Sequence, residues 1–228
     1  MEYPPLQPNA ARARQAWLFI LAVLIITALE IPATLLEMSV IRNYLANPDG
    51  YQEGDFDLSD ALQGLLGLGH VALYLAAAVF FVRWMARAHA NYELASQNAS
   101  LYTSSAVKWA FFIPILNLFR PYQILKEMRD DLQKIVGGAR NNYPNWRLGT
   151  WWGFWIVAQI ISQVVFRLSL NYETVEELLY LDYWVIFSNL LDLAAGGLVY
   201  GVIRDQQALE DQYETMRRIQ ELEGGQTE

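Results

Sequence analysis

Long apolar runs dominate the pattern of hydrophobic and polar positions along this chain. They cover residues 17–38, 61–82, 150–168 and 183–203. Each has about 20 residues, the length that a helix needs to cross the hydrocarbon core of a bilayer. Runs such as WLFILAVLII and LAAAVFFV lack the polar face that a helix of a soluble four-helix bundle presents to water. The pattern therefore predicts an all-α, polytopic membrane protein with four transmembrane helices.

A fifth apolar segment, residues 105–120, is too short to span a membrane. Its most apolar part, Trp109–Phe119, reaches only about 16 Å as a helix, roughly half of the ~30 Å hydrocarbon core. Pro114 and Asn117 interrupt it further. Basic residues flank the segment on both sides, and positive charge marks the cytoplasmic face. We therefore expect a re-entrant or interfacial segment that enters and leaves on the cytoplasmic side.

Residues 121–136 are predicted to form an amphipathic helix. Apolar residues recur there at helical spacing, charged residues occupy the opposite face, and Gly137 with Gly138 should end the helix. Two interpretations remain open. The helix can lie on the inner membrane surface, or it can pack on the protein itself.

Both ends of the chain are polar. Residues 1–16, which begin with a Pro-rich stretch, are predicted to be a disordered cytoplasmic N-terminus. Residues 204–228 are predicted to be a charged cytoplasmic tail. One stripe of this tail is apolar and suited to docking or self-association, with Leu209, Tyr213, Met216, Ile219 and Leu222 at helical spacing.

The distribution of charge orients the predicted spans. Fourteen of the sixteen Lys and Arg fall on the side of the two termini, and only Arg42 and Arg167 lie near the other side. The two acidic loops fall on that other side. Because cytoplasmic loops carry an excess of Lys and Arg, both termini are predicted to be cytoplasmic.

Composition narrows the classes of function. The net charge of -8 argues against nucleic acid as a partner. The absence of Cys excludes disulfides and thiolate catalysis, and two His are too few for a multi-His metal site. No phosphate-binding loop, GxSxG or HExxH motif occurs. We therefore expect no cofactor, no metal and no enzymatic activity.

Four polar residues within the predicted spans form a candidate intramembrane layer. They are Glu30, His70, Gln163 and Asp192. At ~1.5 Å per residue the three ionisable ones lie at the same depth, ~12–14 Å from the outer boundary. Ionisable groups are costly in a membrane and are functional candidates there. Three interpretations compete: a structural polar cluster, a proton or cation relay, and metal binding through Glu30, His70 and Asp192.

A second candidate site lies on the predicted cytoplasmic face. It comprises Arg83, Trp84, Arg87, Asn91, Trp109, Pro114, Asn117, Arg120 and Tyr122, with Lys126 and Arg129 nearby. Arginines interleaved with aromatic residues can bind anionic lipid headgroups. Ordinary positive-inside anchoring explains the same charges. Asn91 and Asn117 are interpreted as caps of broken helices.

These residues resemble those of a bacterial multi-pass membrane family. The resemblance rests on an RAxxN pattern at Arg87–Asn91, a FIPxxNLxRPYQ pattern at Phe112–Gln123, and Trp151-Trp152. The family is catalogued as domain of unknown function 4328. This chain departs from it at Thr103–Ser105, where a Pro-Gly-Trp-like approach is common, and at Phe119, where Trp is common. The resemblance implies membrane architecture and no particular activity.

The sequence thus favours a multi-pass protein of a bacterial cytoplasmic (inner) membrane. The first functional hypothesis is a non-enzymatic protein that acts through membrane lipids, a membrane-protein partner or a second copy of itself at its cytoplasmic face. The alternative is a small proton- or cation-coupled channel or transporter that uses the intramembrane layer.

Overall fold

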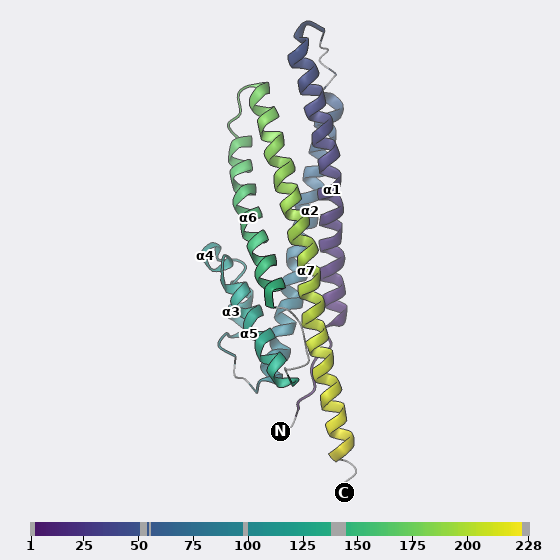
Figure 1. The fold of residues 1–228 in the computed structure, drawn as a ribbon, viewed down its shortest axis with the longest axis vertical. Coiled ribbons are helices and arrows are strands. Elements are labelled where there is room, and N and C mark those ends of the chain that lie inside the picture. The colour runs from purple at the N-terminus through teal and green to yellow at the C-terminus, as the bar shows by residue number, and fades with distance from the viewer. Residues whose placement is uncertain (1–2, 51–53, 55, 98–99, 138–144, 225–228) are drawn as a thin grey trace. The chain divides into compact units, whose positions relative to one another are not determined.

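All regular secondary structure in the described part of the chain is helical. A computed structural model describes residues 3–50, 54, 56–97, 100–137 and 145–224 (Figure 1). Its elements are α1 (Ala10–Ala46), the 3-10 turn η1 (Pro48–Gly50), α2 (Asp57–Ala95), α3 (Ser104–Trp109), α4 (Pro114–Asn117), α5 (Arg120–Ile135), α6 (Asn145–Ser169) and α7 (Val175–Gly224). The all-α prediction is confirmed for these residues.

Four of these helices, α1, α2, α6 and α7, are long and apolar enough to cross a membrane. The predicted number of candidate spans is therefore confirmed. α1, α2 and α7 run well beyond the predicted apolar windows. The predicted tail is helical up to Gly224, because α7 continues through it without a break.

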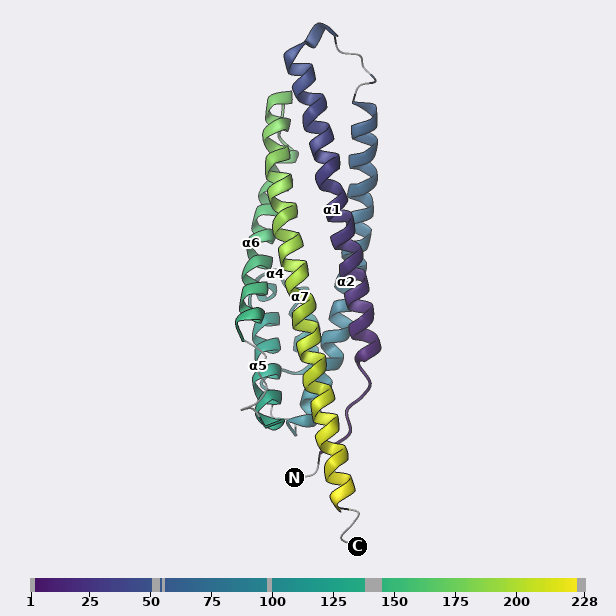
Figure 2. The same cartoon turned by 45° about the vertical axis from the view of Figure 1, so that its right-hand side comes forward.

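The chain divides into two compact units. Unit 2 comprises residues 19–77 and 151–197. Within it, α6 and α7 run side by side and are joined by the short link at residues 170–174 (Figure 2). α7 also approaches α1 closely at Gly196, where a Cβ atom would collide with the side chain of Leu24. Glycine at this position lets the two helices pack backbone to side chain.

Unit 1 comprises the described residues within 1–18, 78–150 and 198–228. It holds α3, α4 and α5 together with the ends of the long helices. Its core is made of large, fully buried side chains, among them Trp84, Met85, Tyr92, Ile124, Met128, Leu132, Leu209 and Tyr213. The first half of the predicted tail stripe thus belongs to this core, while Ile219 and Leu222 are exposed.

The position of α5 agrees closely with the predicted helix at 121–136. Gly137, with a φ of +89°, follows the C-cap residue Val136, as a glycine stop requires. The apolar face of α5 is buried inside unit 1, including Ile124, Met128 and Leu132. The structure therefore supports packing on the protein, the second of the two interpretations.

The segment at 105–120 forms two short helices. The hydroxyl of Thr103 caps α3 by accepting a hydrogen bond from the amide of Ala106 (3.2 Å). Pro114 begins α4, where the missing N–H of proline has no cost. Re-entry of this segment into a membrane stays a prediction.

The N-terminal segment differs from the disordered stretch predicted for residues 1–16. α1 already begins at Ala10, and residues 3–9, here called the strap, are extended and hydrogen-bonded to α2 and α7. Composition suggested disorder because the strap is rich in proline. Its backbone groups are instead satisfied by residues more than 80 positions away in the sequence.

Candidate functional site

The intramembrane layer of unit 2 is centred on one close contact. Nδ1 of His70 on α2 lies 2.8 Å from Oε1 of Glu30 on α1. Both side chains are largely shielded, with exposed fractions of 23% and 12%. Asp192 of α7 lies close enough for its charge to act on His70. Glu30 and His70 are thus in direct contact, and Asp192 acts on His70 through its charge.

Gln163 does not join this layer, which corrects the sequence prediction. It lies on the exposed side of α6. The polar contacts of α6 come instead from Gln159, which donates to the hydroxyl of Tyr74 (3.3 Å), and from Ser162, whose hydroxyl lies 3.0 Å from that of Ser188. The prediction failed because adjacent positions on a helix differ by about 100° in direction, so Ser162 and Gln163 face different sides.

The metal interpretation of this layer finds no support. Among the residues that the structure describes, no group of three His, Asp or Glu side chains is placed to hold a metal ion. The contact between Glu30 and His70 fits both the structural cluster and the proton relay.

Unit 1 contains a buried ion cluster that the sequence analysis missed. Asp205 of α7 is 1% exposed and accepts hydrogen bonds from two arginines. Nη2 of Arg129 lies 3.1 Å from Oδ2, and Nη1 of Arg147 lies 2.8 Å from Oδ1 and 2.7 Å from Oδ2. The cluster links α5, α6 and α7. Arg129, interpreted from the sequence as part of a lipid-binding surface, is 3% exposed and serves this cluster.

A second polar contact anchors the start of the α3–α5 region. The hydroxyl of Tyr92, on α2, is 2.8 Å from Oδ2 of Asp131 and 3.1 Å from Oε1 of Glu127. The same Glu127 oxygen accepts the amide N–H of Leu101 (2.7 Å). Burial, together with these two carboxylates, raises the pKa of Tyr92 well above its usual value. Tyr92 therefore remains a hydrogen-bond donor that ties α2 to α5.

The predicted cytoplasmic-face residues fall into two groups. Trp84 and Asn91 are buried, with exposed fractions of 0% and 1%, so they are not part of a lipid-contacting surface. Asn91 is also no helix cap, because it lies inside α2 and binds the strap. Asn117 ends α4, and the N-caps of α4 and α5 are Ile113 and Phe119, neither with a side-chain capping bond.

The remaining members of this set are at least partly exposed. Arg83, Trp109 and Pro114 are exposed, and Arg87, Arg120 and Tyr122 are half-buried. Arg83 lies over the ring of Phe80 (5.6 Å), and Arg120 lies over the rings of Tyr102 (5.0 Å) and Phe119 (5.7 Å). Burial, and then the charges of Arg87 and Arg83, lower the pKa of Arg12 on α1. Arg12 therefore lies within reach of the charges of Arg83 and Arg87.

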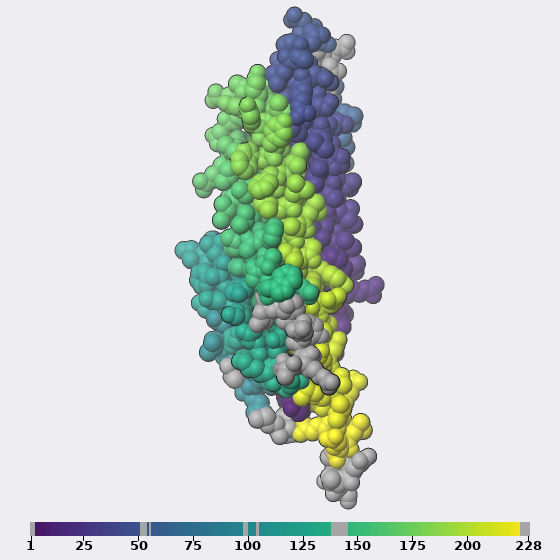
Figure 3. All heavy atoms as spheres, in the orientation of Figure 1, coloured from purple at the N-terminus to yellow at the C-terminus, as the bar shows by residue number. Residues whose placement is uncertain are grey.

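The α3–α4 segment carries a concentrated apolar surface, here called the apolar patch. Its residues are Trp109, Phe112, Ile113, Ile115, Leu118 and Phe119, with exposed fractions from 39% to 73%. Figure 3 shows the segment in teal, standing out beside α5. Exposed Lys108 and half-buried Arg120 border the patch. Exposed apolar residues gathered in one short segment are typical of a site of contact with a membrane or a partner.

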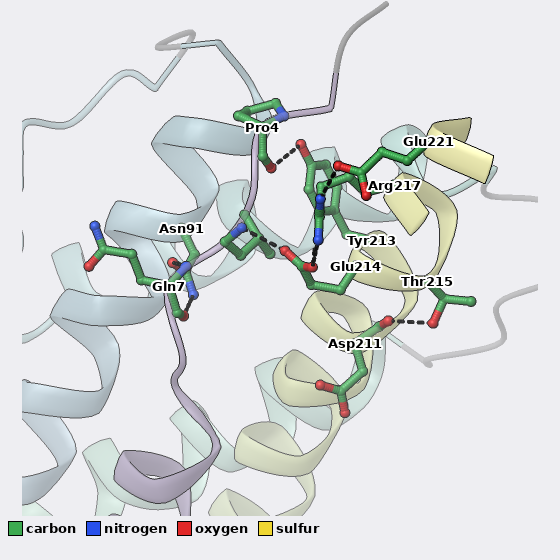
Figure 4. Close-up of polar contacts among 10 residues, drawn as sticks. Pro4, Gln7, Asn91, Asp211, Tyr213, Glu214, Thr215, Arg217 and Glu221 are labelled. Carbon is green, nitrogen blue, oxygen red and sulfur yellow. Dashed lines mark hydrogen bonds and ion pairs between the residues drawn. The ribbon is translucent and has the colours of Figure 1, made fainter. Parts of the chain in front are cut away.

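The strap is bound through its backbone. Asn91 accepts a hydrogen bond from the amide of Gln7 (2.9 Å) and donates one to the carbonyl of Gln7 (2.9 Å). Oε1 of Glu214 accepts the amide of Leu6 (2.6 Å), and the hydroxyl of Tyr213 donates to the carbonyl of Pro4 (3.2 Å). Figure 4 shows the strap passing between Asn91 of α2 and these two residues of α7.

The fold and the exposed apolar surfaces define the class of this protein. It is an α-helical protein with four helices that are long and apolar enough to cross a membrane. Comparison with family models gives the more particular assignment. The chain belongs to the family described as domain of unknown function (DUF4328), whose model matches residues 49–208. Neither the curated proteins nor the solved structures gave a match.

Proposed function

We propose that this protein is a non-enzymatic, integral protein of a bacterial inner membrane that acts through anionic lipids at its cytoplasmic face. The apolar patch of α3 and α4 is the observation that carries the proposal. Trp, Phe, Ile and Leu side chains that remain exposed in a well-packed unit are suited to the boundary between headgroups and acyl chains. The patch therefore contacts the bilayer, as a re-entrant or interfacial segment.

The charges around the patch specify which lipids it meets. Lys108 and Arg120 border it, and Arg12, Arg83 and Arg87 lie in the same unit. Each cation near an anionic membrane surface contributes about 1 kcal/mol of attraction. The excess of Lys and Arg on this side also supports a cytoplasmic location of both termini.

Neutralising Lys108 and Arg120 is expected to weaken the binding of phosphatidylglycerol. Loss of two cations should cost about 2 kcal/mol, or about thirtyfold in affinity. Native mass spectrometry of the protein titrated with phosphatidylglycerol or phosphatidylcholine measures the change for Lys108→Gln/Arg120→Gln. Lys134→Gln is the matched control, since Lys134 is 75% exposed on α5 and pairs only locally with Asp131. Equal phosphatidylglycerol binding by both variants would refute the lipid role of the patch.

A proton or cation pathway is the second candidate, and the contact between Glu30 and His70 is the observation that favours it. If the layer conducts, Glu30→Gln should abolish proton or cation flux in liposomes that contain the purified protein, because the amide cannot exchange a proton with His70. Gln163→Ala, on the exposed side of α6, is the control and should leave flux unchanged. An inactive wild-type protein, with Glu30→Gln merely less stable, would assign the layer a structural role.

A further inference from the structure

The strap is held by polar side chains of α2 and α7, and these residues are here called the strap-binding face. It comprises Asn91 of α2 and Glu210, Tyr213 and Glu214 of α7. Each contributes a polar side chain that binds the strap or orients a residue that does. Apart from Glu214, which is half-buried, their side chains are almost fully buried. These values hold with the strap in place, and the hydrogen bond between Asn91 and Glu210 joins α2 to α7 on this face.

Asn91 binds both backbone groups of one strap residue. Its Oδ1 accepts the N–H of Gln7, and its Nδ2 donates to the C=O of the same residue, each at 2.9 Å. The second hydrogen of Nδ2 goes to Oε2 of Glu210 (2.9 Å). Carbonyl and carboxylate oxygens only accept, so the orientation of this amide is fixed by its partners. Asn91 is thus committed to an extended backbone at this position.

Glu210 and Glu214 are themselves held in place. Oε1 of Glu210 accepts from Nδ2 of Asn9 (3.3 Å), so both of its oxygens are used. Glu210 lies beyond the apolar part of α7, and burial raises its pKa to about 7. Oε2 of Glu214 accepts from Nε of Arg217 (3.1 Å), which leaves Oε1 for the amide of Leu6 (Figure 4).

Most strap contacts do not depend on strap side chains. The amides of Leu6 and Gln7 and the carbonyls of Pro4 and Gln7 make the backbone bonds. The side chains of Pro5, Gln7 and Pro8 are exposed. The side-chain contacts come from the ends, where Asn9 reaches Glu210 and the Tyr3 ring meets the Tyr213 ring edge-on (5.5 Å). A different segment with the same backbone pattern would make the same central bonds.

We propose that the strap-binding face is a binding site for an extended, proline-containing peptide segment of a partner protein, which the strap occupies in cis. Proline holds a segment extended before it binds, which lowers the entropic cost of binding. Both carboxylates accept N–H groups of the strap, Glu214 from the amide of Leu6 and Glu210 from the side chain of Asn9, so the partner segment offers N–H donors at these two places. The tethered strap competes at an effective concentration in the millimolar range, so the partner binds when the strap is displaced.

The first test uses a variant of the whole chain in which the strap is released from the strap-binding face. Leu6→Pro/Gln7→Pro removes the two N–H donors of the strap and leaves the strap-binding face intact. A fluorescently labelled peptide of residues 2–10 should bind this variant saturably, at least about tenfold more tightly than it binds the wild type. Adding Asn91→Ala should abolish that gain. A peptide of residues 2–10 that carries the Leu6→Pro and Gln7→Pro changes should not bind. Equal binding of the two peptides by the freed variant would overturn the proposal.

A second measurement uses the unmodified protein and does not depend on how the variants fold. Hydrogen exchange at the amides of Leu6 and Gln7 should be slow while the strap is bound, because both are hydrogen-bonded. Millimolar unlabelled peptide of residues 2–10 should accelerate it by displacing the strap, and the proline-substituted peptide should not. Unchanged exchange with both peptides would show that the face serves the strap alone and would likewise overturn the proposal.

Discussion

Replacement of Asp205 with Asn is expected to lower the free energy of unfolding by about 3–5 kcal/mol. Asn keeps the size of the side chain and removes the charge that neutralises Arg129 and Arg147. Arg129 is almost fully buried, so water cannot replace the lost carboxylate. Breaking a buried ion pair from one side leaves an uncompensated charge, which accounts for the size of the effect.

Thermal unfolding in detergent measures this loss as a lower melting temperature. Asp211→Asn is the matched control, because Asp211 lies on the same helix and is exposed, and its carboxylate accepts a hydrogen bond from Gln207 of that helix. It should change the stability by less than about 0.5 kcal/mol. Equal melting temperatures for the two variants would mean that Asp205 is not the buried centre of an ion cluster.

Replacement of Trp84 with Ala should destabilise the protein by about 3–5 kcal/mol, whereas the same change at Trp109 should have little effect on stability. The sequence assigned both residues to one cytoplasmic-face motif. In the structure Trp84 is fully buried against Phe81 (ring centroids 5.2 Å apart), and Trp109 is 61% exposed. Truncation at Trp84 therefore creates a cavity, while truncation at Trp109 removes surface.

The same unfolding measurement separates the two cases. A large loss for Trp84→Ala with a small loss for Trp109→Ala is the expected result. A larger loss of stability for Trp109→Ala than for Trp84→Ala would place Trp109 in the core and remove it from the apolar patch.

The number of helices able to span a membrane could be predicted because hydrophobic run length alone decides it. The position of α5 was predictable for a similar reason, since helical periodicity and Gly137 mark its face and its end. These features depend on residues close together in the sequence.

The buried ion cluster and the strap could not be predicted, because their partners are far apart in the sequence. Arg129 lies 76 positions from Asp205, and an arginine near a membrane end also fits simple anchoring. The strap was assigned to disorder from its prolines, yet Asn91, 84 positions from Gln7, supplies hydrogen bonds to both backbone groups of Gln7. Gln163 was misplaced by a single position on α6.

The depth of the apolar patch in a bilayer tests the central claim most directly. Because the chain has no Cys, a single nitroxide label can be placed at Phe112→Cys in the patch or at Glu223→Cys near the end of α7. Electron paramagnetic resonance in vesicles with phosphatidylglycerol then compares collisions with oxygen, which concentrates in lipid, and with a water-soluble nickel chelate. The label at 112 should favour oxygen and the label at 223 should favour the chelate. Equal preference for the chelate at both positions would contradict a membrane contact of α3 and α4.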